Sequence, residues 1–255
     1  MHWCLGTYAS GSTWLFNCVL QAATALRAER PVVGRFVTQQ HEVELPAGNS
    51  VLHVIKTHYA DEMATAILQR QADAIWISVR DPRDSITSLM QYQGFRFASA
   101  LDLVDRSARF AARFAADSRS RVFRYEGGFI DNISTLDEIA AGFDGKLAAA
   151  DRERIFAETR RQAIEALVAR LEKMPTAIRQ PTGDIIDPAT QWHLHHAGRT
   201  GEVGRWRRLL TAPQVSLTEQ RLQDWMATFG YHAELAPYHL KIGEFRWHDV
   251  TPASH

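Results

Sequence analysis

Residues 6–17 read Gly-Thr-Tyr-Ala-Ser-Gly-Ser-Thr-Trp-Leu-Phe-Asn, and this stretch decides the fold. A short apolar run at residues 3–5 precedes it and is typical of a buried strand. Apolar residues then recur at helical spacing and predict a helix with one apolar face: Leu15, Val19, Ala22 and Leu26. We therefore expect a strand, a turn of small residues and a helix, in that order.

A turn of this kind leaves the first backbone N–H groups of the helix without partners inside the helix. Together with the helix dipole these donors favour an anion, and hydroxyls on both sides of Gly11 add side-chain donors: Ser10, Ser12 and Thr13. We interpret the turn as a phosphate cradle, with Trp14 close enough to stack on a base. A turn that only caps the helix is the alternative.

The cradle differs from the usual nucleotide-triphosphate loop, whose motif is Gly-x4-Gly-Lys-Ser/Thr. Gly6 and Gly11 have the required separation, but Ser12 stands where that motif has its lysine. A phosphate loop without this lysine points to donors other than ATP.

The composition is that of an ordinary globular protein, with 255 residues, 45% hydrophobic and 23% charged. The formal net charge is zero, so neither nucleic acid nor a membrane is indicated as the main partner. Any anion site must therefore come from locally placed groups. Only four of the 29 basic residues are lysine, which draws attention to Lys56.

The two cysteines, Cys4 and Cys18, show neither a paired framework nor metal-ligand spacing, and we expect both to be reduced core residues. The first strand begins almost at Met1, so no signal peptide fits before it, and no run of about 18 apolar residues exists. We therefore expect a cytoplasmic protein.

Apolar runs alternate with helical patterns in the first part of the chain. Strands are expected at residues 2–5, 51–55, 74–79 and 121–125, and helices at 61–71, 84–92, 101–115 and 130–143. This alternation predicts an α/β fold with a central parallel sheet flanked by helices, in a single domain spanning residues 1–255. Ligands bind outside the carboxyl ends of the strands in such sheets.

The second half is more helical. We expect a helix at 151–172, a long loop at 175–200 and a last helix at about 217–229. The loop carries a histidine patch, His193, His195 and His196, for which no Cys or carboxylate partner is visible, so a metal site is disfavoured. A solvated loop and a loop that contacts an acceptor both stay open.

Lys56 and His58 lie at the end of the second run, in Val-Ile-Lys-Thr-His. Because they are two positions apart in an extended strand, both side chains point to the same face. A cation beside an imidazole suits a transfer reaction, since the histidine can take a proton from an acceptor hydroxyl and the lysine can neutralise a leaving group. An ordinary polar strand end is the second interpretation.

Two further segments predict anion binding. Arg80 closes the third run and Ser88 follows on the next helix, and an arginine at a strand end can hold a phosphate as a fork. A capped helix with surface ion pairs is the alternative there. Residues 199–206 read Arg-Thr-Gly-Glu-Val-Gly-Arg-Trp, and their two glycines among arginines predict a flexible, basic loop.

Together these segments resemble the sulfotransferases, of the bacterial, cytosolic type, that use 3′-phosphoadenosine 5′-phosphosulfate (PAPS). The first turn is similar to that family's Tyr-Pro-Lys-Ser-Gly-Thr-Thr-Trp, which holds the phosphosulfate and stacks the adenine, and the matching residues are Ser10, Gly11, Ser12, Thr13 and Trp14. Lys56 and His58 match the family's Lys-Thr-His, in which the histidine is the catalytic base.

Arg80 and Ser88 keep the eight-residue spacing of the family's 3′-phosphate ligands, and Tyr125-Glu126 is similar to its Tyr-Glu-Asp near the adenine. The late loop is similar to the closing Arg-Lys-Gly-x-x-Gly-Asp-Trp, which implies cofactor-binding roles for Arg199, Thr200 and Gly201. The resemblance runs in the family's order from residue 7 to about 206.

The resemblance implies a P-loop-like phosphosulfate loop in one sulfotransferase domain. It also implies in-line transfer of a sulfuryl group from PAPS to the hydroxyl of a small-molecule acceptor. His58 would act as the base and Lys56 at the leaving group, with release of 3′,5′-adenosine bisphosphate (PAP). No metal is implied. The acceptor pocket is expected along residues 35–47, 92–97 and 175–197, whose aromatics suggest an apolar acceptor or else core packing.

Two family lysines are missing, because Ala9 and Thr200 stand in their places. Loss of the first removes a charge-assisted bond at the leaving group. Lys56 or a nearby arginine would have to supply the charge, or the chain would be a slow enzyme or a non-catalytic PAP- or PAPS-binding protein. Because Lys56 and His58 are retained, we favour an active enzyme.

The sequence is also compatible with two different classes of protein. An atypical P-loop kinase would need an aspartate that holds Mg²⁺ after an apolar strand, for which Asp81 is the candidate. A structural or interaction protein that kept the fold would bind no nucleotide. The oligomeric state cannot be read from the sequence.

Overall fold

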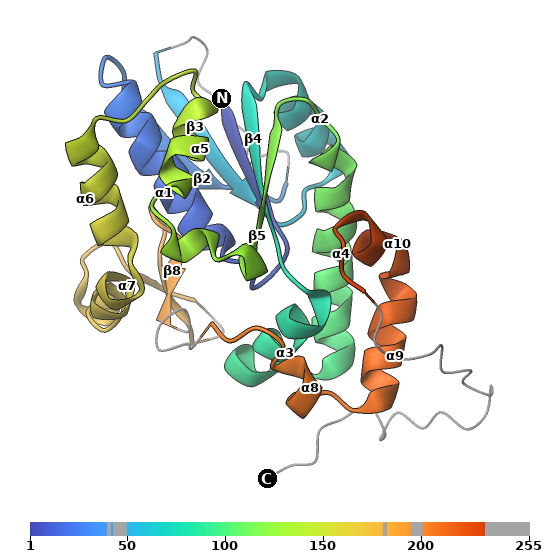
Figure 1. Cartoon of the computed structure of the whole chain (residues 1–255). Coiled ribbons are helices and arrows are strands. Elements are labelled where there is room, and N and C mark those ends of the chain that lie inside the picture. Colours follow the sequence, from blue (N-terminus) through green and yellow to red (C-terminus); the bar gives the residue numbers. More distant parts are fainter. Residues whose placement is uncertain (40–41, 43–49, 181–182, 195–200, 233–255) are drawn as a thin grey trace.

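The computed structural model describes residues 1–39, 42, 50–180, 183–194 and 201–232, and these form a central sheet flanked by helices (Figure 1). The sheet has the spatial order β2-β3-β1-β4-β5, and all its pairings are parallel. Its strands are β1 (His2–Gly6), β2 (Val32–Phe36), β3 (Leu52–Thr57), β4 (Ala74–Val79) and β5 (Ser120–Arg124). The predicted α/β class with a central parallel sheet is confirmed.

The three central strands carry the core of the sheet. Every residue of β1, β3 and β4 is buried, which explains their nearly continuous apolar runs. Strand β1 pairs with β3 on one side and with β4 on the other, so the order of the chain reverses beside β1. A crevice forms at the carboxyl ends of strands where the order reverses in this way.

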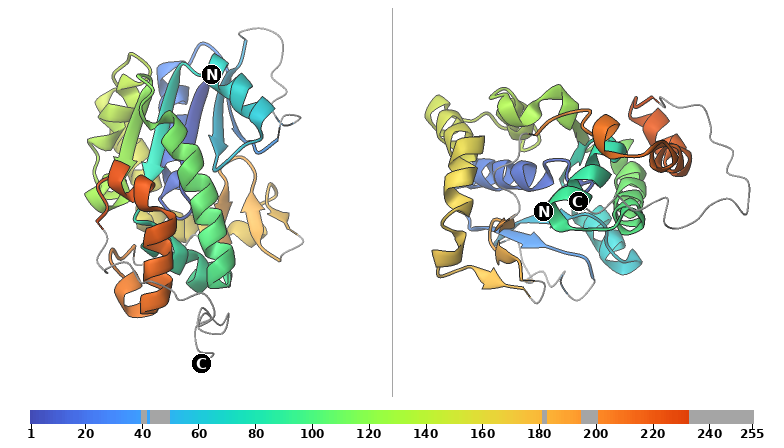
Figure 2. Two further views of the ribbon diagram at one scale, coloured as in Figure 1. Left: turned by 90° about the vertical axis from the view of Figure 1, so that its right-hand side faces the viewer. Right: turned by 90° about the horizontal axis from the view of Figure 1, so that it is seen from below.

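Alternate strand residues point to the two faces of the sheet, and each face has its own helices. One face packs against α1 (Ser12–Leu26), α5 (Thr135–Ala141), α6 (Ala149–Thr159) and α7 (Arg161–Val168). The other packs against α2 (Glu62–Gln71), α3 (Pro82–Gln93), α4 (Phe97–Ala115), α9 (Ala212–Arg221) and α10 (Gln223–Thr228). Figure 2 shows the blue and yellow helices of the first set on one side and the green and orange-red helices of the second set on the other.

The structure corrects several sequence expectations in the first half of the chain. Strand β2 was not expected, because Gly34 and Arg35 interrupt its apolar pattern and its residues are only half-buried at the sheet edge. The helix expected at 130–143 is a 3₁₀ turn at residues 129–131 followed by the shorter α5, which begins at Thr135.

The second half also differs from the expectation. The helix expected at 151–172 is divided into α6 and α7, because Arg160 is extended, with φ −60° and ψ 150°. The part of the loop 175–200 that the structure describes contains an antiparallel sheet of β6 (Ile178–Arg179), β7 (Ile185–Asp187) and β8 (Trp192–His193). The last helix begins earlier, after the Thr211 capping box, and is interrupted at Leu222 between α9 and α10.

The cysteines are placed as the sequence predicts. Cys4 and Cys18 are buried and unpaired, and burial raises the pKa of both thiols above the ordinary value. Among the described residues, no helix combines the length and hydropathy that a bilayer crossing requires.

Gly6 ends β1 at a point where the backbone has no space for a side chain. A Cβ there would lie 2.4 Å from Ser78 Oγ and 2.6 Å from Ser12 Cβ. Ser10 Oγ closes the turn behind it, 2.7 Å from the Thr7 carbonyl and 2.8 Å from Ser78 Oγ. The turn after β1 is therefore packed directly onto β4.

We expect Gly6→Ala to lower the free energy of unfolding by about 1–3 kcal/mol, because an added methyl overpacks a buried site. Urea denaturation followed by circular dichroism measures this change. Gly127→Ala is the matched control, since a Cβ at Gly127 meets no atom within 4 Å. Equal unfolding free energies for the two variants would contradict the close packing at Gly6.

Candidate functional site

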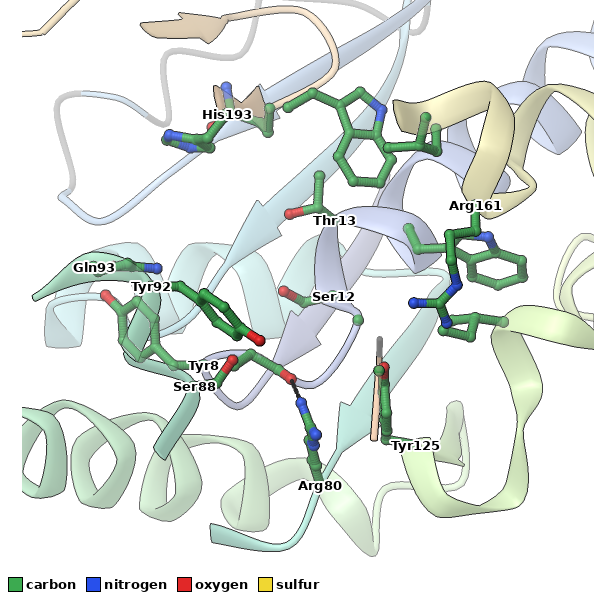
Figure 3. A pocket seen from close by; sticks show the side chains of 18 of the residues that line it. Tyr8, Ser12, Thr13, Arg80, Ser88, Tyr92, Gln93, Tyr125, Arg161 and His193 are labelled. Atoms are coloured by element: carbon green, nitrogen blue, oxygen red, sulfur yellow. Dashed lines mark hydrogen bonds between the residues drawn. The ribbon is translucent and has the colours of Figure 1, made fainter. Parts of the chain in front are cut away.

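A cavity of about 410 Å³ lies at the carboxyl end of the central strands, and Figure 3 shows side chains that line it. This volume is within the range of small-molecule sites. The turn after β1, the ends of β3 and β4, helices α3 and α7, and the small sheet β6–β8 all contribute residues to its wall. Ten residues selected from the sequence line it: Gly11, Ser12, Thr13, Trp14, Lys56, His58, Arg80, Ser88, Tyr125 and Gly201.

Three selected residues are not among the lining residues. Ser10 is fully buried, and its hydroxyl is bonded within the turn and to β4 rather than turned to the cavity. Arg199 and Thr200 lie outside the described residues.

The turn after β1 presents the start of α1 to the cavity. Ala9 and Gly11 both have left-handed backbone angles, with φ of 57° and 80°, which reverse the chain sharply. Gly11 is the N-cap of α1 and provides no side-chain cap, so the first N–H groups of this helix are left for a ligand. This arrangement disfavours the interpretation of the turn as a simple cap.

Lys56 is a buried cation at the end of β3. Its Nζ donates a hydrogen bond of 2.6 Å to Thr13 Oγ1, which connects β3 to the first turn of α1. Burial lowers the pKa of Lys56 to about 7, because the protein interior replaces the water that stabilises an ammonium ion. An anion bound in the cavity would favour the charged form.

His58 is held in one tautomer. Its Nδ1 lies 2.7 Å from the Gly6 carbonyl oxygen, which can only accept, so Nδ1 carries the proton and Nε2 is the acceptor in the neutral ring. The ring stacks on Tyr8 with centroids 4.1 Å apart. Burial and the neighbouring Lys56 lower the pKa of His58 to about 3, so the imidazole is neutral at physiological pH. A neutral imidazole with an unprotonated Nε2 is the form that can act as a base.

Arg80 joins two loops at the cavity wall. It donates to the carbonyl oxygens of Ala9 and Glu202, at 3.1 and 2.9 Å. Its guanidinium carbon lies 4.2 Å from the centroid of the Tyr125 ring, and Figure 3 shows the two side chains next to each other. Arg80 therefore fixes the loop around Gly201 against the turn after β1.

The loop around Gly201 is anchored by a buried carboxylate. Asp84 accepts hydrogen bonds from the backbone N–H groups of Gly204 and Trp206, at 2.6 and 3.0 Å. Gly201 has a φ of 65°, and a Cβ there would lie 2.6 Å from Tyr125 Oη and 2.7 Å from a guanidinium nitrogen of Arg161. Only glycine satisfies both the backbone angle and the close approach.

Asp81, the residue that a kinase would need for Mg²⁺, is engaged elsewhere. Its carboxylate forms an ion pair of 2.7 Å with Arg83 and also accepts from the Arg83 backbone N–H. It is not among the residues that line the cavity. The geometry therefore does not favour a kinase.

The segments expected to form an acceptor pocket contribute in part. Phe36, Tyr92 and Gln93 line the cavity, as do residues in or next to the small sheet: Gln180, Ile186, Gln191, Trp192 and His193. Phe97 instead packs in the core, and much of 40–47 lies outside the described residues. His193 Nδ1 lies 2.6 Å from Asp184 Oδ2, so a carboxylate orients this second imidazole.

Sequence reasoning did not select two arginines that line the cavity, Arg161 and Arg205. Arg205 stands in the late loop and is hydrogen-bonded to the Tyr92 hydroxyl. Arg161 lay within a segment that looked like one continuous helix. No Gly or Pro marks the interruption at Arg160, so no sequence signal distinguished Arg161.

Comparison with solved structures finds sulfotransferase folds. Mouse sulfotransferase SULT7A1 complexed with PAP aligns with a TM-score of 0.61 and 16% identity, covering 88% of this chain and 83% of that one. Retinol dehydratase aligns in its complex with androsterone and the inactive cofactor PAP, with a TM-score of 0.55, 14% identity and coverages of 93% and 82%. Its complex with retinol and PAP gives a TM-score of 0.53, 13% identity and coverages of 92% and 82%.

Comparison by sequence gives no match. No family model matches the chain, and no curated protein matches it significantly. At these low identities, the structural similarity to the solved structures shows a shared fold.

The lowered pKa of His58 predicts how stability depends on pH. Because the folded pKa is about 3 and the ordinary value is 6.5, the unfolded chain binds more protons between these limits. Stability should therefore be complete above about pH 6.5 and fall on acidification, with His58 contributing up to about 1.4 kcal/mol per pH unit.

Urea unfolding of wild type and His58→Phe from pH 7 to pH 4 measures this contribution. The slope of the unfolding free energy against pH should be smaller in the variant. Part of the pH dependence should remain in the variant, because burial also lowers the pKa of His2 to about 4. Identical slopes would show that His58 is not held neutral in the folded chain.

Proposed function

We propose that this chain is a PAPS-dependent sulfotransferase that transfers a sulfuryl group to the hydroxyl of a small molecule and releases PAP. One observation carries the proposal: His58, in the tautomer of a proton acceptor, lines the same cavity as the buried Lys56 and the uncapped start of α1. The fold shared with sulfotransferases solved with PAP supports it. We further propose that residues 1–255 act as one sulfotransferase domain.

In this proposal the donor nucleotide lies along the turn after β1. The backbone of Gly11 and the hydroxyls of Ser12 and Thr13 bind the phosphosulfate, with Ser10 supporting the turn from behind. Trp14 and Tyr125 border the adenine, whereas the 3′-phosphate lies against Arg80, Ser88 and the late loop with Arg199, Thr200 and Gly201. Lys56, bonded to Thr13, supplies a charge at the leaving group that Ala9 does not.

The reaction is an in-line displacement at sulfur. The acceptor oxygen forms a bond to sulfur while the bond from sulfur to the bridging oxygen breaks, and the electron pair stays on the 5′-phosphate of PAP. The acceptor proton passes to His58 Nε2. Lys56 and the N–H groups of α1 stabilise the charge that grows on the bridging oxygen, so catalysis consists of positioning and electrostatic stabilisation.

The wall near His58 favours an acceptor with polar groups besides its reacting hydroxyl. Gln93, Gln191 and His193 contribute amide and imidazole groups there, beside the aromatic rings of Tyr8 and Phe36. The rings fit the apolar acceptor that the sequence suggests, and the amide and imidazole groups add contacts for polar substituents on it.

We expect His58→Ala to reduce sulfuryl transfer by at least about 100-fold and to leave PAP affinity unchanged, because a general base acts on the acceptor and not on the nucleotide. Calorimetric titration with PAP, beside ATP with Mg²⁺, tests the donor site. Transfer of labelled sulfate from PAPS to a panel of phenols, alcohols and sugars tests the base.

Wild type should bind PAP at micromolar concentration or tighter and ATP with Mg²⁺ much more weakly. Absence of PAP binding would refute the sulfotransferase assignment. Binding without transfer to any acceptor would instead indicate a non-catalytic nucleotide-binding protein. Transfer that persists in His58→Ala would refute the assignment of the base.

Lys56 should take up a proton when PAP binds. Its pKa of about 7 rises when an anion binds beside it, so at pH 8 the largely neutral amine becomes protonated on binding. PAP affinity should accordingly fall as the pH rises above 7. Calorimetry in two buffers of different ionisation enthalpy measures the uptake.

The uptake at pH 8 should approach one proton per chain and disappear in Lys56→Met. Lys146→Met, at an exposed lysine outside the cavity, is the matched control and should behave as wild type. Undiminished uptake in Lys56→Met would show that another group titrates.

A further inference from the structure

Arg161 is a cation of the cavity to which the proposed function assigns no role. It is the first residue of α7, and its side chain is 37% exposed, so it is accessible to a ligand while it lines the wall. Figure 3 shows it on the opposite side of the cavity from Tyr8, Tyr92 and His193. Arg161 therefore lies away from the expected acceptor and near Tyr125, the residue expected beside the adenine.

The guanidinium of Arg161 is packed against the loop around Gly201. Its two terminal nitrogens lie 2.7 and 3.1 Å from the point where a Cβ of residue 201 would stand, and Tyr125 Oη lies 2.6 Å from the same point. Arg80 covers the ring of the same tyrosine and donates to the carbonyl of the next residue, Glu202. Two arginines from distant segments thus converge on one tyrosine and one glycine loop.

The interruption between α6 and α7 directs Arg161 to this place. Arg160 is extended, so α6 ends at Thr159 and α7 starts in a new direction. Trp14 Nε1 donates to the Thr159 carbonyl at 3.0 Å and fixes the interruption beside the start of α1. The neighbouring Arg160 is exposed and is not among the lining residues.

Every lysine and arginine of the described wall has protein partners. Lys56 donates to Thr13, Arg80 to two carbonyl oxygens, and Arg205 to the Tyr92 hydroxyl. Arg161 faces Asp131 at 4.0 Å, in a pair whose carboxylate is 66% exposed. An exposed pair at this distance contributes little, so a phosphate dianion can displace it.

Carboxylates also lie near this corner. Glu202 is bound by Arg208 at 2.7 Å, whereas Asp131 and Glu165 line the same wall as Arg161, so a bound phosphate has to compete with them for the guanidinium. The planar guanidinium presents a fork that matches two oxygens of a phosphate, which a lysine cannot do.

We propose that Arg161 binds the 3′-phosphate of the donor nucleotide and thereby replaces the lysine for which this chain has Thr200. The inference rests on the proposed function, since it concerns the same nucleotide. The required charge then comes from the start of α7, which packs against the loop at Gly201.

Calorimetric titration with PAP and with adenosine 5′-phosphate separates the two phosphates, because the second ligand lacks the 3′-phosphate. Wild type should prefer PAP. Arg161→Ala should lower the affinity for PAP by tenfold or more and change the affinity for adenosine 5′-phosphate less than twofold. Arg161→Lys should recover part of the loss, because the charge returns without the fork.

Arg160→Ala is the matched control, because it removes the same charge one residue away, and it should leave both affinities unchanged. Two results for Arg161→Ala would overturn the inference. Equal loss of affinity for both ligands would assign Arg161 to the adenine or to the loop, and unchanged PAP affinity would show that Arg161 does not bind the nucleotide. If wild type binds neither nucleotide, the proposed function itself fails. Thermal unfolding of each variant verifies that the fold is retained.

Discussion

The hydrogen bond from His58 Nδ1 to the Gly6 carbonyl is the interaction on which the arrangement of the cavity depends. It forms because β1 and β3 are adjacent and parallel, with Leu5 opposite Thr57, so that the next residue of each strand meets at the same edge. Gly6 has to lack a side chain there, since Ser12 and Ser78 occupy the space. This contact thus fixes the tautomer of the histidine and the position of Gly6, where β1 ends and the turn that leads to α1 begins.

The electrostatics of the cavity follow from burying two ionisable nitrogen groups, Lys56 and His58. Lys56 and His58 both have lowered pKa values, and each lies in the interior beside the uncapped start of a helix. In such surroundings the charged forms are unfavourable until an anion binds. A low dielectric constant raises the cost of an unpaired charge, and it also strengthens the attraction between that charge and a bound anion. A chain of zero net charge can therefore contain a strongly anion-seeking site.

The features that could be predicted from the sequence are those whose signals are local. The strand, turn and helix of residues 2–26 have continuous apolar or periodic patterns, and Lys56 and His58 share a face by strand geometry alone. Strand β2 was missed because an edge strand is only half-buried. Arg161 was missed because its position depends on an interruption at Arg160 that no Gly or Pro announces. The orientation of the Ser10 hydroxyl could not be predicted, because it depends on Ser78, 68 positions away.

The two lysine positions that depart from the sulfotransferase motif illustrate the difference between a motif and a site. A motif compares residues at equal positions along the chain, whereas a bound phosphate responds to charge at a point in space. Lys56 reaches Thr13 from β3, and Arg161 reaches the loop at Gly201 from α7, and our proposals give these two cations the roles of the lysines that Ala9 and Thr200 replace. The fold is shared at 16% identity. Because a sheet fixes where its strands end, several elements around those ends are in a position to supply a charge.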